Sequence, residues 1–140
     1  MSDTSPLQTT LAAEHAAVWL YTTLGGQTSE SAQPKLFDTV SSGYTRHRTR
    51  RDQLVRWIRD AGEQPVAAEV AYELPNQLRT PDEVEAAGLQ IEQRCTVTYA
   101  DMVGRTVAAE REWAIKALLD ASLRELDLGG APQDLPGIDT

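Results

Sequence analysis

Several residue types that define whole classes of protein are scarce in this sequence. It has one cysteine, Cys95, in 140 residues, so it can form no internal disulfide and contains no cysteine-based zinc or redox motif. It also lacks any run of about eighteen apolar residues, which excludes a predicted transmembrane helix. The opening segment MSDTSPLQ has neither the basic region nor the apolar region of a secretory signal, so we expect a cytoplasmic protein.

Positive charge is scarce as well. The chain has 13 Lys and Arg residues against 21 Asp and Glu residues, a net charge of -8. Binding to phosphates needs a surplus of Lys and Arg at the docking surface, so we expect neither nucleic acid nor a membrane as partner. The content of 41% hydrophobic and 24% charged residues is ordinary for a globular protein, and we predict one domain over residues 1–140.

Four segments of the sequence have the periodicity of amphipathic helices. Apolar residues recur at steps of three and four, and no alternating strand pattern competes with them. Proline or glycine stands near most of the segment ends. The predicted helices cover residues 7–24, 36–61 (opened by Pro34), 80–103 and 106–128. The predicted core therefore spans about residues 7–128, followed by a tail at 129–140.

The connection between the second and third helices, residues 62–81, is long. Pro65 and Pro75 prevent one continuous helix there. A helix of roughly 22 residues is about 33 Å long, whereas about 20 extended residues reach roughly 60 Å. The connection can therefore run the full length of a bundle, and we predict an all-α four-helix bundle with a crossover between helices 2 and 3. We expect the crossover to pack through Val66, Val70, Tyr72 and Leu74.

Polar residues lie on helix faces that the periodicity predicts to be buried. Glu14, His47 and Glu92 occupy such positions on the first, second and third helices. Bundles that bind two iron or manganese ions place one Glu on each of two helices and a Glu-x-x-His on each of the others. Glu14 and Glu92 fit the lone-Glu positions and His47 fits a His position. Tyr44, however, replaces the expected Glu three residues before His47, and the fourth helix has no histidine.

Two interpretations of these residues follow. In the first, His47 is a structural histidine bonded to Glu14 or Glu92, and the protein is a binding or interaction module with a degenerate or absent di-metal site, without cofactor or catalytic residue. In the second, Glu14, His47 and Glu92 hold one Fe or Mn ion, with Tyr44 as a neighbour, and the protein is a metal-dependent oxidoreductase.

The second helix carries many arginines, and its predicted buried stripe includes Arg51. The arginines are spread around the helix, so we expect salt bridges to acidic residues, and binding of anions or nucleic acid is the alternative. On the first helix, Trp19 and Leu20 lie off the stripe of Glu14. Apolar residues outside the predicted buried stripe would be left on the surface, so we predict that they form the interface of a homodimer.

Five short segments together carry a resemblance to a known family. They are AEHAA at 13–17, HRTRRDQL at 47–54, AYELP at 71–75, LQIE at 89–92 and GAPQDLPG at 130–137. In this order and spacing, over roughly residues 7–138, the chain resembles the actinobacterial ferritin-like proteins with a DUF4439-type domain. The resemblance implies a ferritin-like bundle. It implies no activity, because that family is one of unknown function.

Overall fold

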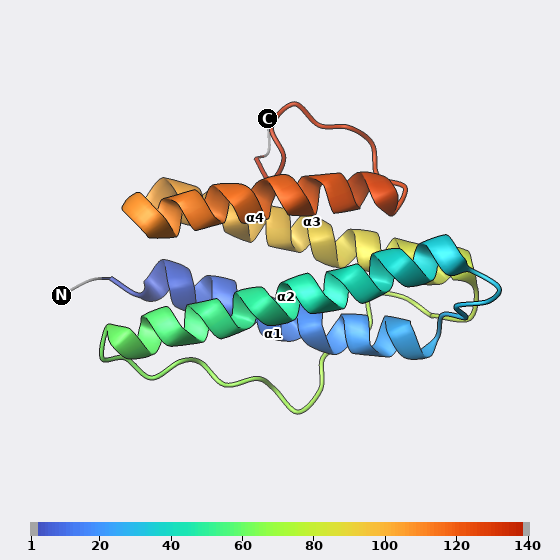
Figure 1. Cartoon of the computed structure of the whole chain (residues 1–140), viewed down its shortest axis with the longest axis horizontal. Helices are drawn as coiled ribbons and strands as arrows, with labels where there is room; N and C mark the ends of the chain where they lie inside the picture. The colour runs from blue at the N-terminus through green and yellow to red at the C-terminus, as the bar shows by residue number, and fades with distance from the viewer. Residues whose placement is uncertain (1–2, 139–140) are drawn as a thin grey trace.

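The computed structural model describes residues 3–138 as four helices joined by irregular segments (Figure 1). The helices are α1 (Ser5–Gly26), α2 (Pro34–Asp60), α3 (Pro81–Arg105) and α4 (Ala108–Asp127). No strand occurs within residues 3–138. The prediction of an all-α protein with four helices is therefore confirmed, and the helix ends lie within about two residues of the predicted ones.

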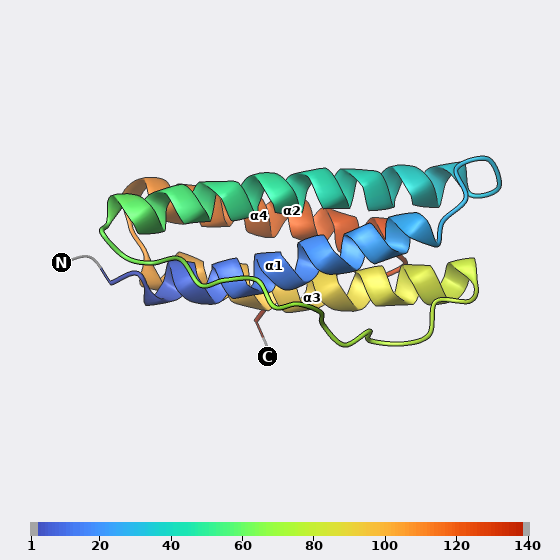
Figure 2. The same cartoon turned by 90° about the horizontal axis from the view of Figure 1, so that it is seen from below.

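The helices form two antiparallel pairs, α1 with α2 and α3 with α4 (Figures 1 and 2). Helix α2 ends at one end of the bundle and α3 begins at the other, so residues 61–80 run along its whole length. As a result α2 and α3 point in the same direction, and α1 and α3 point in opposite directions. None of the helices within residues 3–138 combines the length and apolar character needed to cross a membrane.

The crossover is held mainly by polar contacts with α1. The side chain of Gln8 bonds the carbonyl of Gln64 and the amide of Val66, both at 2.8 Å. Nε2 of His15 lies 2.9 Å from the carbonyl oxygen of Val66. These contacts satisfy backbone N–H and C=O groups at Gln64 and Val66, where the crossover has no helix or strand to bond them.

Only one of the four side chains expected to anchor the crossover packs on a helix. The ring of Tyr72 lies 5.9 Å from that of Trp19 on α1. The other three are exposed, and Val70 lies fully in solvent. The expectation was wrong for these three because the crossover is fixed through its backbone. The three exposed side chains are Val66, Val70 and Leu74.

The apolar residues that suggested a dimer on α1 are covered within the chain itself. Leu20 is buried in the core, and Trp19 is half-buried beneath Tyr72 of the crossover. Neither residue is a leftover apolar group, so this reason for expecting a dimer is wrong.

The fully buried apolar residues of α4 are small, and several of its large apolar residues face solvent. Its buried apolar positions are Ala114, Ala117 and Ala121. Val107 lies just before the helix and is 70% exposed. Four large apolar side chains on the outer side of α4 are 42–64% exposed, and we call them the α4 outer stripe. They are Ile115, Leu119, Leu123 and Leu126.

Candidate functional site

The centre of the bundle holds two carboxylates with an imidazole between them. Glu14, His47 and Glu92 come from α1, α2 and α3, and all three side chains are completely buried. Nδ1 of His47 lies 2.6 Å from Oε2 of Glu14, and Nε2 lies 2.7 Å from Oε1 of Glu92. The structure thus brings the three predicted residues together, with the two nitrogens of one ring used by two different carboxylates.

Two tyrosines cap the carboxylates in a reciprocal way. The hydroxyl of Tyr21 on α1 donates to Oε1 of Glu92 at 2.6 Å, and the hydroxyl of Tyr99 on α3 donates to Oε1 of Glu14. On both helices the tyrosine follows the glutamate in the pattern Glu-(x)6-Tyr. Because α1 and α3 are antiparallel, two turns of helix bring each tyrosine level with the glutamate of the other helix. We call the set of five residues the Glu-His-Glu cluster: Glu14, His47, Glu92, Tyr21 and Tyr99.

Gly43 on α2 makes room for one of these tyrosines. A Cβ atom at this position would lie 2.5 Å from Cε1 of Tyr21, far inside van der Waals contact. The missing side chain lets the Tyr21 ring lie over the imidazole of His47, with centroids 5.3 Å apart and planes inclined by 21°. The close approach of α1 and α2 therefore depends on glycine here.

A layer of two arginines and an aspartate covers the cluster on the side of α4. Arg50 donates from Nη1 to the hydroxyl of Tyr99 at 3.3 Å and from Nη2 to Oδ2 of Asp120 at 2.5 Å. Arg124 donates to the same Asp120 oxygen at 3.2 Å. Its Nε lies 3.4 Å from Oε1 of Glu92. Asp120 therefore joins α2 and α4 above the cluster.

The arginine in the interior of α2 is not the predicted one. Arg51 is half-exposed and pairs with its neighbour Asp52 at 2.9 Å, whereas Arg50 is 8% exposed. The prediction was wrong by one position, which corresponds to a rotation of about 100° around the helix. The buried face of α2 runs through Gly43, His47 and Arg50, and Gly43 lies against the ring of Tyr21.

His47 is a cation at neutral pH. Burial alone would lower its pKa, but the charges of Glu92 and Glu14 and their hydrogen bonds outweigh burial and raise the pKa from 6.5 to about 9. For Glu92, burial is the largest single influence and raises the pKa, but His47, Tyr21 and Arg124 together outweigh it, and the pKa falls below its usual value. Burial, followed by the nearby carboxylates, raises the pKa of Tyr21 and Tyr99 well above 10, so both stay neutral donors.

The cluster and its arginine layer balance their charges. With His47 protonated, three cations face three carboxylates, all within one connected set of contacts. Buried charges are tolerated when they are paired and hydrogen-bonded in this manner. The cations are His47, Arg50 and Arg124, and the carboxylates are Glu14, Glu92 and Asp120.

The donor set would suit Fe or Mn, but the arrangement does not fit a metal centre. The ring nitrogens of His47 face opposite carboxylates at hydrogen-bond distance, so one ion cannot take both nitrogens. Metal–ligand bonds near 2 Å need the lone pair of a neutral imidazole, which an imidazolium lacks. Within residues 3–138 no group of three His, Cys, Asp or Glu side chains has the geometry to hold a metal ion. A metal at Glu14, His47 and Glu92 stays a prediction.

Tyr44, the expected neighbour of the site, lies outside the cluster. It is half-buried, and with Tyr21, Phe37 and Val40 it lines a shallow groove between α1 and α2. The residues that sequence reasoning missed are Tyr21, Tyr99, Arg50, Asp120 and Arg124. The repeated Glu-(x)6-Tyr pattern is the signal that could have identified the two tyrosines.

Comparisons with known proteins place the chain by family and by fold. Residues 6–140 match the family model described as "Domain of unknown function (DUF4439)". No curated protein matches the chain. Among solved structures, the crystal structure of the conserved hypothetical protein rv2844 from Mycobacterium tuberculosis is similar, with a TM-score of 0.81 and 21% identity over 89% of this chain and 92% of that one. At this identity the likeness shows a common fold.

Proposed function

Since the chain belongs to the DUF4439 family, a family of unknown function, we propose that it is a ferritin-like binding module rather than an enzyme, and that it associates as a homodimer. The ferritin-like part of the proposal rests on the connection between α2 and α3 and on the lone-Glu positions taken by Glu14 and Glu92. A cytoplasmic location remains the expectation from the sequence.

The occupation of both ring nitrogens of His47 is the observation that carries the non-enzymatic part. In a metal centre one nitrogen would bind the ion and the other would bind a supporting group. Here both nitrogens meet carboxylates, and Tyr21, Tyr99 and Arg124 stabilise those carboxylates further. An imidazolium therefore takes the position at which a metal ion would neutralise the two glutamates.

The α4 outer stripe supports the homodimer. Its members are spaced by four, four and three residues, so they share one side of the helix. A two-fold interface must be self-complementary, and two antiparallel copies of α4 would place Leu119 of one copy against Leu123 of the other. The stripe continues into a groove of about 380 Å³ against the tail, lined also by Pro132 and Pro136. Contiguous apolar surface of this kind is typical of interaction sites.

Sedimentation equilibrium tests the homodimer. We expect the full chain to be dimeric at micromolar concentration and the double variant Leu119→Glu, Leu123→Glu to be monomeric. The matched control is Val70→Glu, Leu74→Glu, because it adds the same charge at exposed apolar positions on the crossover. A full chain that stays monomeric at high micromolar concentration would eliminate the dimer.

One observation favours the alternative, a metal-dependent oxidoreductase. Oε2 of Glu92 is buried and has no hydrogen-bond partner among residues 3–138, and such an acceptor can attract a cation. Metal analysis of protein purified without chelator separates the two functions. Stoichiometric Fe or Mn that is lost in His47→Ala would support the oxidoreductase, whereas sub-stoichiometric metal in both proteins would support the binding module.

A further inference from the structure

We propose that the cavity between α2 and α4 binds a small oxyanion, a carboxylate or a phosphate. The cavity has a volume of about 250 Å³ and lies outside the Glu-His-Glu cluster, from which Arg50 separates it. This ligand class goes beyond the proposed function. The site and the homodimer can fail separately, because the cavity lies between two helices and shares no residue with the α4 outer stripe.

Three cations line the cavity. Arg46 and Arg50 come from α2, and Lys116 comes from α4. Thr49 adds a hydroxyl, and the half-buried indole of Trp113 forms one wall. This is a local surplus of positive charge in a chain whose net charge is -8. An anion entering from solvent would find its most favourable potential where several cations converge in a recess.

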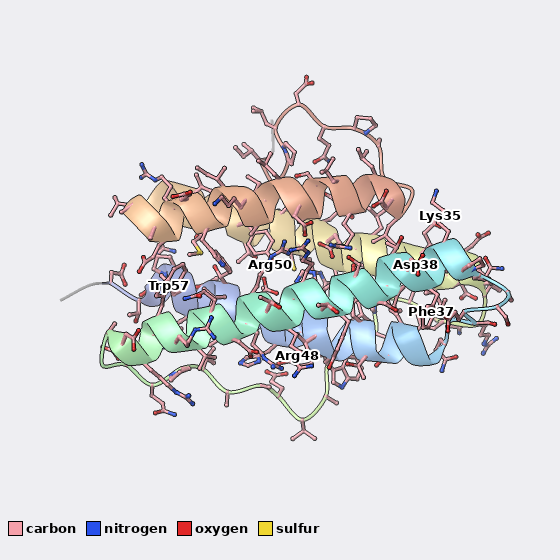
Figure 3. All side chains as sticks on the ribbon, viewed as in Figure 1. Lys35, Phe37, Asp38, Arg48, Arg50 and Trp57 are labelled. Atoms are coloured by element: carbon pink, nitrogen blue, oxygen red, sulfur yellow. The ribbon has the colours of Figure 1, made fainter. Side chains whose placement is uncertain are left out.

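Arg50 is held in place before any ligand arrives. Its guanidinium lies 5.3 Å from the centroid of the Tyr99 ring, and it donates to the Tyr99 hydroxyl and to Asp120. Figure 3 shows Arg50 on the side of α2 that faces α4, whereas Arg48 lies on the opposite side of the same helix. A side chain fixed in this way loses little conformational entropy when it binds an anion.

The carboxylates near the cavity do not cancel the charge of the other two cations. Asp120, the one carboxylate in the lining, is shared by Arg50 and Arg124. Lys116 pairs with Glu112 at 3.1 Å, but both side chains are at least 70% exposed, so the pair is weak and easily exchanged. Arg46 has no ion-pair partner among residues 3–138.

The size of the cavity limits the ligand. Pockets for drug-sized molecules usually measure about 300–1,000 Å³, so this one suits an anion of few atoms. Guanidinium groups bind carboxylate and phosphate alike through pairs of hydrogen bonds. The wall formed by Trp113 and Ala117 would accept a flat or apolar body attached to the charged group.

NMR titration of the full-length, ¹⁵N-labelled protein tests this site with two probes, inorganic phosphate and benzoate, at constant ionic strength. We expect saturable shifts of the Trp113 indole N–H and of Arg50 Nε, with a Kd of about 1 mM or below for at least one probe. Saturation with benzoate alone would assign a carboxylate ligand, and saturation with phosphate alone would assign a phosphate. The absence of saturable shifts with both probes would overturn the proposal.

A pair of double variants separates a built site from general attraction between charges. Arg46→Gln, Lys116→Gln removes two cations from the cavity and should weaken binding by about tenfold or more. Arg56→Gln, Arg59→Gln removes the same charge from exposed positions farther along α2 and should leave the Kd within about twofold. Equal weakening in both double variants would overturn the proposal, because it would mean that net charge alone governs binding.

Discussion

The centre of the bundle and the outer side of α4 reverse the usual distribution of residues. At the centre, Glu14, His47 and Glu92 are completely buried, whereas Leu119 and Leu123 on α4 are more than 60% exposed. The cluster is tolerated because each of its charges has a partner of opposite charge. The exposed leucines have no comparable partner within residues 3–138. The centre of the bundle thus contains paired charges within a hydrophobic core, and the apolar surface of α4 is available to another molecule.

Helix α4 explains how one chain can have both features. Its alanines allow α4 to approach α3 closely, and its longer buried side chain, Arg124, reaches Glu92. We therefore expect substitutions at the centre to change folding and substitutions on the outer stripe to change association, and the following experiments test this separation.

The largest effect should come from removing the imidazole. In His47→Ala two buried carboxylates lose the cation between them, and we expect the free energy of unfolding to fall by about 3–5 kcal/mol in urea denaturation. His15→Ala is the matched control, since His15 is half-exposed and its ring nitrogen bonds the crossover carbonyl of Val66 rather than a carboxylate. It should cost about 1 kcal/mol or less. Equal losses in the two variants would contradict the role of the cluster.

The pH dependence of the free energy of unfolding should report the positive charge of His47. The pKa of His47 is about 9 in the folded chain and 6.5 in the unfolded one, so the folded state binds the extra proton between these values. Its stabilisation is complete below about pH 6.5 and should be lost as the pH rises through 9, by about 3 kcal/mol in total. Urea titrations across this range in wild type and His47→Gln would measure the difference. A wild-type profile as flat as that of the variant would contradict the assignment.

Removing a tyrosine hydroxyl should have an intermediate effect. Tyr99→Phe takes a donor from the completely buried Glu14 and an acceptor from Arg50, and we expect a loss of about 1–3 kcal/mol in the free energy of unfolding. Tyr44→Phe is the matched control in the same bundle, because Tyr44 is half-buried outside the cluster. Its effect should stay within about 0.5 kcal/mol. A larger loss of stability in Tyr44→Phe than in Tyr99→Phe would contradict the role of the Tyr99 hydroxyl in the cluster.

The smallest effect on folding should come from the outer stripe. Leu123→Ser replaces a large apolar side chain that is 64% exposed, so the free energy of unfolding at low protein concentration should change by no more than about 0.5 kcal/mol. Ala121→Ser, two residues earlier and fully buried, would place a hydroxyl in the core and should cost more. Thermal or urea denaturation of both variants makes the comparison. A larger loss for Leu123→Ser would assign the outer stripe to the fold itself.

The fold and part of the cluster could be predicted because both depend on periodicity. The stripes of α1, α2 and α3 pointed Glu14, His47 and Glu92 inward, and the length of residues 62–81 allowed the crossover. The choice between Arg50 and Arg51 could not be made in this way, because either position continues a stripe with steps of three and four from His47 to Leu54.

The periodicity of the sequence could not predict that α4 contributes Asp120 and Arg124 to the surroundings of the cluster. The buried alanines of α4 follow the periodicity, but the pattern does not indicate which charged residues of this helix face the core. Arg124 and Asp120 reach the cluster only because the backbone of α4 is close to it, and this proximity follows from packing between helices. The reciprocal tyrosines were readable in principle, since the Glu-(x)6-Tyr pattern occurs on both α1 and α3.

The protonation state of His47 tests the central claim most directly. In ¹⁵N-labelled protein purified without chelator, the NMR shifts of the two ring nitrogens report whether each carries a proton. We predict that both nitrogens are protonated at neutral pH and that the ring titrates with a pKa of about 9. A ring that is neutral at pH 7, or one with a nitrogen bound to a metal ion, would contradict the account of a charge-paired core.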